Sequence, residues 1–131
     1  MILFGKKKAI SFWGPFMTSH AKQSLKFWVP KLENAKDFDN FRAKMKANLW
    51  LWSPFFDIQI TEETNDTFKL HLGNCPFCEV LNNAGLSDLN PYVCEGDWVL
   101  ARENKDKWIF DREHQIGTGD SFCDHTYKRK K

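Results

Sequence analysis

The four cysteines of this chain all lie in its C-terminal half, and each stands beside other residues that could take part in chemistry. They occur in the motifs Cys-Pro-Phe-Cys-Glu (75–79), Cys-Glu-Gly-Asp (94–97) and Gly-Asp-Ser-Phe-Cys-Asp (119–124). The residues before Cys75 contain no cysteine. Thiols that gather in this way indicate a site that is being built rather than a core that is being filled.

The first motif places two thiols at the start of a predicted helix. Pro76 suits the first turn of a helix over residues 76–84, and Gly85 suits its C-terminal cap. Cys75 then occupies the N-cap, where free backbone N–H groups and the helix dipole favour a thiolate. Cys78 follows on the same face, and this spacing suits zinc, an iron–sulfur cluster or redox chemistry. The alternative is that two small side chains pack beside a helix start.

The second motif combines a thiol, a carboxylate and an indole. Pro91 predicts a helix that extends to about residue 103. Cys94, Asp97 and Trp98 are then three and four residues apart and share one face. Asp97 could act as a general base or orient a nitrogen of a ligand. The alternative is an exposed Asp97 beside a buried Cys94 and Trp98.

The third motif belongs to a predicted hairpin, with strands over residues 107–116 and 122–127 joined by a glycine-containing turn. Alternation along a strand puts Cys123 and Asp124 on opposite faces. Arg112 and His114 share a face of the preceding strand. Arg112 could hold a carboxylate through two hydrogen bonds, and His114 could act as an acid, a base or a ligand.

The rest of the chain supplies the scaffold. Apolar residues at helical spacing predict helices over residues 6–13 and 17–28, separated by Gly14-Pro15, and over residues 38–52, stopped by Pro54. Alternation over residues 56–60 and 68–72 predicts a hairpin. The expected fold is α+β, a single domain of residues 1–131. N-terminal helices pack on an antiparallel sheet of two hairpins, with two short helices between them, and the aromatic stripes form the core.

The composition of the chain indicates which kinds of partner it is expected to bind. The net charge is only +2, and lysines gather near both ends without a nucleic-acid-binding motif. No apolar stretch approaches the ~20 residues that span a bilayer, and the N-terminus does not match a signal peptide. We therefore expect a cytoplasmic protein with reduced thiols. Its expected partner is a small molecule rather than a membrane or a nucleic acid, and a homo-oligomer is compatible with the sequence.

The order of these motifs resembles the L-2-amino-thiazoline-4-carboxylic acid hydrolase family over residues 74–127. The shared features are a cysteine that opens a short helix, a glycine-containing link, a Cys-x2-Asp helix, an arginine on a strand and a terminal Gly-Asp-x2-Cys-Asp hairpin. In this chain they are Cys75, Gly85, Cys94 with Asp97, Arg112, and residues 119–124. The N-terminal half agrees only in its helical character. The last hairpin is also similar to vinyl-reductase-type small-molecule-binding domains.

The resemblance implies hydrolysis of a carbon–nitrogen bond in a cyclic amidine such as a thiazoline carboxylate. This reaction needs a nucleophile, an acid for the leaving nitrogen and a cation for the substrate carboxylate. Cys75 or Cys94 could be the nucleophile, Asp97 the acid or base, and Arg112 the carboxylate clamp. The predicted substrate-binding residues are Arg112, His114, Trp98 and Asp124.

Two residues depart from the family pattern and favour a metal. Cys78 adds a second thiol, and His125 stands where an aromatic residue is expected. The alternative ligand set is Cys75, Cys78, Cys94 and Cys123, which could hold zinc or an iron–sulfur cluster. Three functions thus remain open from the sequence: a hydrolase with a cysteine–aspartate site, a metal or cluster protein, and a sensory domain that binds a small molecule without turnover.

Overall fold

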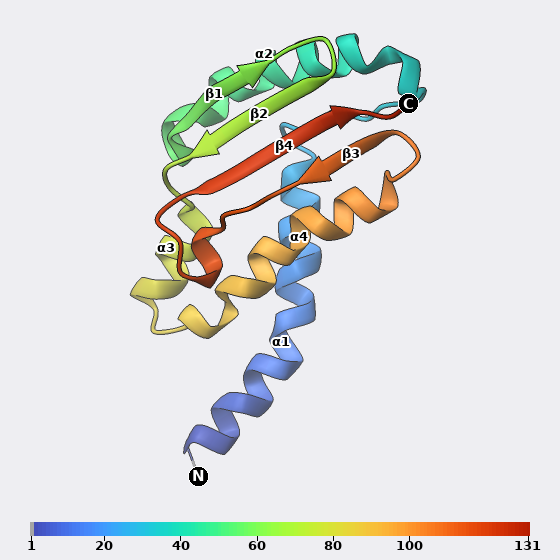
Figure 1. The fold of residues 1–131 in the computed structure, drawn as a ribbon. Coiled ribbons are helices and arrows are strands. Elements are labelled where there is room, and N and C mark those ends of the chain that lie inside the picture. Colours follow the sequence, from blue (N-terminus) through green and yellow to red (C-terminus); the bar gives the residue numbers. More distant parts are fainter. Residues whose placement is uncertain (1) are drawn as a thin grey trace.

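The computed structural model describes residues 2–131, with side chains from residue 5 onward, and has helices on one face of an antiparallel sheet (Figure 1). The helices are α1 (Ile2–Leu25), α2 (Phe38–Phe56), α3 (Pro76–Asn83) and α4 (Asn90–Glu103). The strands are β1 (Ile58–Glu63), β2 (Thr67–Leu72), β3 (Trp108–Asp111) and β4 (Cys123–Arg129). The predicted α+β class is therefore confirmed. No helix within residues 2–131 is long and apolar enough to cross a membrane.

The sheet has the strand order β1-β2-β4-β3, so the last hairpin adds its second strand beside the first hairpin. Phe68 pairs with Tyr127, and Tyr127 also pairs with Phe110 across the other edge of β4. Because side chains alternate along each strand, these three residues share one face. That face is buried and also carries Cys123 and His125. The sheet therefore presents two site residues toward the helices.

The core is aromatic, as the stripes in the sequence predicted. Phe38, Phe41 and Met45 of α2 are almost completely buried. The Phe41 ring lies 5.8 Å from that of Trp108 and 6.1 Å from that of Tyr127. Close ring contacts of this kind add to the free energy gained from burial alone. The core thus fixes α2 against the buried face of the sheet.

Two predicted helix boundaries were wrong, because both helices continue through a proline. α1 continues through Gly14-Pro15, although Pro15 cannot donate a backbone hydrogen bond. Gly14 lacks a Cβ, which lets the Tyr92 ring lie against the helix, and Thr18 Oγ1 donates to the Tyr92 carbonyl over 2.7 Å. α2 likewise continues past Pro54 and ends at Phe56, and its C-cap residue Asp57 adopts a left-handed φ of 49°.

The second hairpin also differs from the prediction. Its first strand was expected to reach residue 116, but β3 ends at Asp111. Residues 112–122 leave the sheet and include a short 3-10 turn at Ile116–Thr118 before β4 begins. We call residues 112–122 the site loop, since it reaches toward α3 and α4 (Figure 1).

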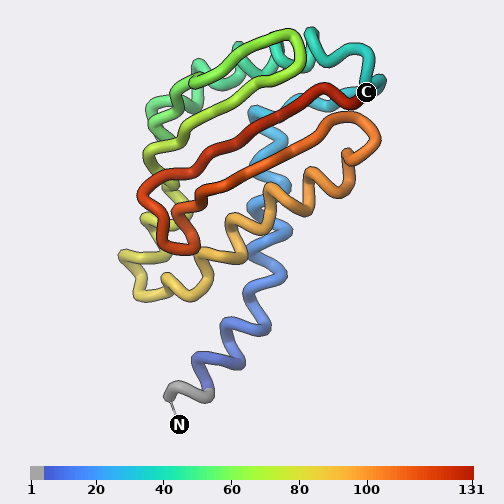
Figure 2. Tube along the Cα trace, viewed as in Figure 1, coloured from blue at the N-terminus to red at the C-terminus, as the bar shows by residue number. Residues whose placement is uncertain are grey.

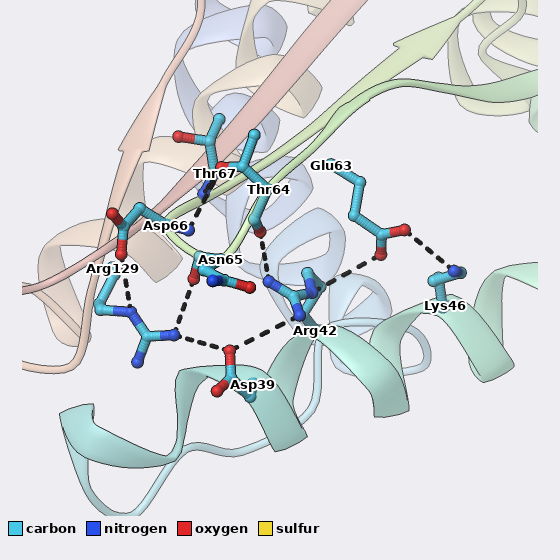
Figure 3. A network of polar contacts seen from close by, with 9 residues as sticks. All are labelled: Asp39, Arg42, Lys46, Glu63, Thr64, Asn65, Asp66, Thr67 and Arg129. Carbon is cyan, nitrogen blue, oxygen red and sulfur yellow. Dashed lines mark hydrogen bonds and ion pairs between the residues drawn. The ribbon is translucent and has the colours of Figure 1, made fainter.

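Figure 2 shows α1 running past α4, and Ile10 and Met17 of α1 pack against the cluster that contains Leu81 and Leu89. At the other end of the fold, a polar network joins α2, the β1–β2 turn and the end of β4 (Figure 3). Arg129 donates from Nη2 to Asp39 over 2.6 Å and from Nε to Asp66 over 3.0 Å. Arg42 donates to the Thr64 carbonyl. Because the network is largely exposed, we expect it to contribute little to the free energy of unfolding. Its contacts nevertheless link the first hairpin to α2 and β4.

Candidate active site

Three elements that the sequence placed far apart meet around one cavity of about 340 Å³. The N-cap of α3, the first half of α4 and the first residues of β4 each contribute side chains to its wall. The residues of this wall that are capable of acid, base or nucleophilic chemistry are Cys75, Cys94, Asp97, Cys123 and His125, with His20 from α1. Two of the three predicted catalytic residues, Cys94 and Asp97, are buried there, and the third, Cys75, is partly exposed.

The thiols form a row in which each interacts with the next. Cys75 affects the pKa of Cys78, Cys78 that of Cys94, and Cys94 that of Cys123. Hydrogen bonds from Cys123 and Cys78 lower the pKa of Cys94 and outweigh its burial. The positive charge of Arg112 and the backbone N–H of Gly117 act in the same direction. The pKa of Cys123 rises, first because of its bond with Cys94, so this thiol keeps its proton.

The site loop holds the thiol row from one side. The backbone N–H of Ile116 donates to the Cys123 sulfur over 3.1 Å. A Cβ at Gly117 would overlap the Cys94 sulfur and approach the Asn90 carbonyl oxygen to 2.7 Å. Only glycine therefore allows the loop to come close enough for its N–H groups to reach both sulfurs.

Arg112 is the centre of the polar part of the site. Its side chain is only 2% exposed. Nη1 donates to the Cys94 carbonyl over 3.1 Å and to Gln115 Oε1 over 2.8 Å. Nη2 donates to Asp97 Oδ2 and lies 2.8 Å from His125 Nε2. Burial lowers the pKa of Arg112, but the Asp97 carboxylate outweighs burial and raises it, so the guanidinium stays charged.

This contact fixes the tautomer of His125. Arginine has only donors, so His125 Nε2 must accept and Nδ1 carries the proton. Burial lowers the pKa of His125 to about 4, which keeps the ring neutral at pH 7. His125 Nδ1 and Asp97 Oδ1 are both buried without a hydrogen-bond partner in the protein. One donor and one acceptor are thus left without a partner on two residues of the cavity wall, both of which Arg112 positions.

The four predicted substrate-binding residues lie outside the cavity wall. Arg112 is behind it, and Trp98 packs edge-on against Phe110 with ring centroids 5.0 Å apart. Asp124 accepts from the backbone N–H of His114 over 2.6 Å, and bonds of this kind lower its pKa although burial raises it. His114 lies on the site loop beside Phe122, with ring centroids 4.5 Å apart. Asp124 and His114 therefore support the site loop.

The row of thiols does not match a preformed zinc site. Four thiolates at about 2.3 Å from one zinc ion would all lie within about 4 Å of one another. Within the part of the chain that the structure describes, one ligand atom each of Glu113, His114 and Asp124 lie within 4.8 Å of one another, whereas no three cysteine sulfurs lie that close together. Asp124 in that group already accepts two backbone hydrogen bonds.

Several site residues escaped prediction from the sequence. His125 was noted only as a departure from the family pattern, yet it lies two residues after Cys123 and so shares its strand face. That period of two could have placed it in the site. Gln115 and Gly117 carried no such indication. Among the aromatic residues of the cavity wall, Trp28 and Trp52 belong to the stripes that were expected to form the core. Phe27, Phe56 and Phe77 were not predicted as site residues.

We expect His125 to make the protein sensitive to acid. Its pKa of about 4 in the folded state lies below the value of about 6.5 for an unperturbed histidine. The unfolded chain therefore binds a proton first, and the free energy of unfolding falls as the pH drops from 6.5 toward 4. The expected loss from this residue is about 2–3 kcal/mol between pH 7 and pH 4.5.

Urea unfolding of the wild type and of His125→Phe at both pH values measures this effect. The variant should lose less stability on acidification, because phenylalanine takes up no proton. An equal acid dependence of the two proteins would show that His125 is not the group responsible.

The fold and the cavity define a class: a small α+β protein with cysteine, aspartate and histidine side chains at the buried end of a cavity of small-molecule size. The family model of the L-2-amino-thiazoline-4-carboxylic acid hydrolases matches residues 2–127. The chain belongs to this family, and the match includes the helical N-terminal half as well as the cysteine-bearing half. A search of curated proteins found no match. Family membership supports a hydrolase-like function on a small molecule.

Proposed function

We propose that this protein hydrolyses a carbon–nitrogen bond of a cyclic amidine, with Cys94 as the nucleophile. The observation that carries the proposal is the position of the Cys94 thiolate. It lines the buried part of the cavity, and its pKa is lowered by interactions with Cys123, Cys78, the Arg112 charge and the backbone of Gly117. Stabilised thiolates of this kind are typical of nucleophilic cysteines.

The reaction divides into two steps on this arrangement. The Cys94 sulfur attacks the amidine carbon and forms a carbon–sulfur bond, after which the ring carbon–nitrogen bond breaks and the leaving nitrogen takes up a proton. Water then adds to the same carbon, loses a proton and expels the Cys94 thiolate. The net change is the addition of one water molecule across the carbon–nitrogen bond, with the thiolate regenerated.

Asp97 and His125 are the groups that we assign to proton transfer and orientation. Asp97 Oδ1 is free to accept an N–H of the amidine, while Oδ2 is held by Arg112. His125 Nδ1–H is free to donate to the leaving nitrogen or the attacking water. Arg112 acts as a positioning residue, because its guanidinium touches Asp97 and His125 but does not line the cavity.

A second function, ligand binding without turnover, is favoured by one observation. The cavity wall is dominated by aromatic and aliphatic side chains, as in many binding domains. A binding domain would not require one thiol to be more reactive than the others. Thiol reactivity therefore separates the two functions.

Alkylation by iodoacetamide tests the proposed nucleophile. An ordinary cysteine, with a pKa near 8.5, reacts about two orders of magnitude more slowly at pH 6 than at pH 8.5, because little thiolate remains. Cys94 should react ahead of Cys78 and Cys123 and keep most of its rate at pH 6. Peptide mass spectrometry after timed quenching measures each cysteine separately. If the four thiols share one rate and the ordinary pH dependence, Cys94 is not an activated nucleophile and the proposal fails.

A further inference from the structure

The cavity has two chemically different ends. Cys94, Cys123, Asp97 and His125 are buried and form the inner end of the cavity. Phe27, whose side chain lies at the surface, is 65% exposed and therefore belongs to the opening. A ligand that binds at the inner end and reaches the opening must contact the part of the cavity wall between them.

Aromatic rings line the path between the two ends. Phe27 and Trp52 contact each other with ring centroids 5.5 Å apart, and Trp28 meets Phe56 edge-on at 4.7 Å. Phe77 extends this wall from α3, with its ring 6.4 Å from that of Phe56. Because these side chains offer faces and edges rather than polar groups, they favour a flat or aliphatic group on the ligand.

The charged residues of the cavity wall disfavour an anionic ligand. Among the residues that the structure describes, no lysine or arginine lines the cavity, whereas the Asp97 carboxylate does. The nearest guanidinium, that of Arg112, lies behind Asp97, and both of its terminal nitrogens already donate to protein acceptors. An anionic group would lose its hydration here without gaining a cationic partner, and it would face Asp97.

The size of the cavity agrees with a larger ligand. Its volume of about 340 Å³ falls within the range of about 300–1,000 Å³ that is usual for drug-sized molecules. A free 2-amino-thiazoline carrying only a carboxylate would leave much of the aromatic wall uncovered.

From these observations we infer that the substrate of this site carries an aromatic or bulky aliphatic group, and no carboxylate, beside its cyclic amidine. The amidine lies at the inner end against Asp97, and the apolar group extends along Trp28, Trp52 and Phe56. The amidine part of this inference rests on the proposed function. The preference for an apolar, non-anionic ligand rests on the cavity wall alone.

Binding of three probes of similar shape tests the preference without any turnover. Benzamidine is cationic, benzamide neutral and benzoate anionic, and isothermal titration calorimetry or ligand-observed NMR gives their affinities for the wild-type protein. Benzamidine should bind at least about tenfold more tightly than benzoate, because only the amidinium can pair with Asp97. Benzoate binding as tightly as benzamidine, or none of the three probes binding, would overturn the inference.

A matched pair of tryptophans on α2 locates the apolar group. Trp52 lines the cavity, whereas Trp50 is 82% exposed and does not. Trp52→Ala should weaken benzamidine binding by about 2- to 12-fold, the range for loss of an aromatic contact, and Trp50→Ala should leave it unchanged. Equal effects of the two substitutions would place the probe outside the cavity and contradict the inference.

Turnover separates this inference from the proposed function. The paired substrates are 2-amino-4-phenyl-2-thiazoline and 2-amino-2-thiazoline-4-carboxylate, which differ only in the group at ring position 4. We expect a higher kcat/KM for the phenyl compound. A higher kcat/KM for the carboxylate would overturn the inference but leave the hydrolase proposal intact. Selective binding of benzamidine with no hydrolysis of either thiazoline would support the cavity preference while overturning the hydrolase proposal.

Discussion

Replacing Arg112 with leucine is expected to lower the free energy of unfolding by about 3–5 kcal/mol, the usual cost of leaving one partner of a buried ion pair alone. The Arg112 side chain is 2% exposed, and that of Asp97 is 10% exposed. Without the guanidinium, the Asp97 carboxylate and the Cys94 carbonyl both lose a buried donor. Urea denaturation followed by tryptophan fluorescence measures the change.

Arg102→Leu provides a matched control on α4. Arg102 also pairs with a carboxylate, that of Glu95 at 2.8 Å, but its side chain is 63% exposed. An exposed pair of this kind contributes at most about 1 kcal/mol. The double variant Arg112→Leu/Asp97→Asn should regain part of the stability lost by Arg112→Leu, since no buried charge remains unpaired. A cost for Arg112→Leu no greater than that for Arg102→Leu would show that the buried network does not stabilise the fold.

The second large effect concerns activity. Cys94→Ser should reduce kcat for hydrolysis of a 2-amino-2-thiazoline by at least about 10³-fold, the scale seen when a catalytic nucleophile is removed. Serine keeps the size of cysteine, but its hydroxyl is far less acidic and less nucleophilic than a stabilised thiolate. The release of ring-opened product, followed by mass spectrometry, gives the rate.

Cys75→Ser is the control that distinguishes the two candidate nucleophiles. Hydrogen bonding with Cys78 also lowers the pKa of Cys75, but the charge of Arg112 and the backbone of Gly117 lower the pKa of Cys94 and not that of Cys75. We expect Cys75→Ser to retain most of the activity. Loss of activity in Cys75→Ser, together with retention in Cys94→Ser, would exchange the roles of the two cysteines.

Local sequence was enough to predict the elements that carry the cysteines. Pro76 and Gly85 mark the bounds of α3, and Pro91 lies in the first turn of α4. These residues act through their own backbone preferences, so their effect does not depend on distant parts of the chain. The alternation in β2 similarly identified its buried face through Phe68, Leu70 and Leu72.

The parts that could not be predicted depend on contacts between distant segments. Arg112 reaches Cys94 and Asp97 only because the chain leaves the sheet after Asp111, and nothing in the local pattern of β3 marks that departure. Likewise, Gly14-Pro15 should interrupt a helix on local grounds, but Tyr92 packs against that turn from α4. Such long-range contacts override local preference without leaving a pattern in the sequence.

The origin of the cavity wall has a consequence for how new substrates could arise. Every group that we assign to bond breaking lies after residue 74. The aromatic residues Trp52 and Phe56 come from α2, and Phe27 and Trp28 come from the turn that follows α1. Substitutions in α2, or at the C-terminal end of α1 and just beyond it, can therefore reshape the chamber without displacing the thiol row or its arginine. The same bond-breaking residues could therefore act on different substrates in different relatives, with the N-terminal segments determining which substrate fits.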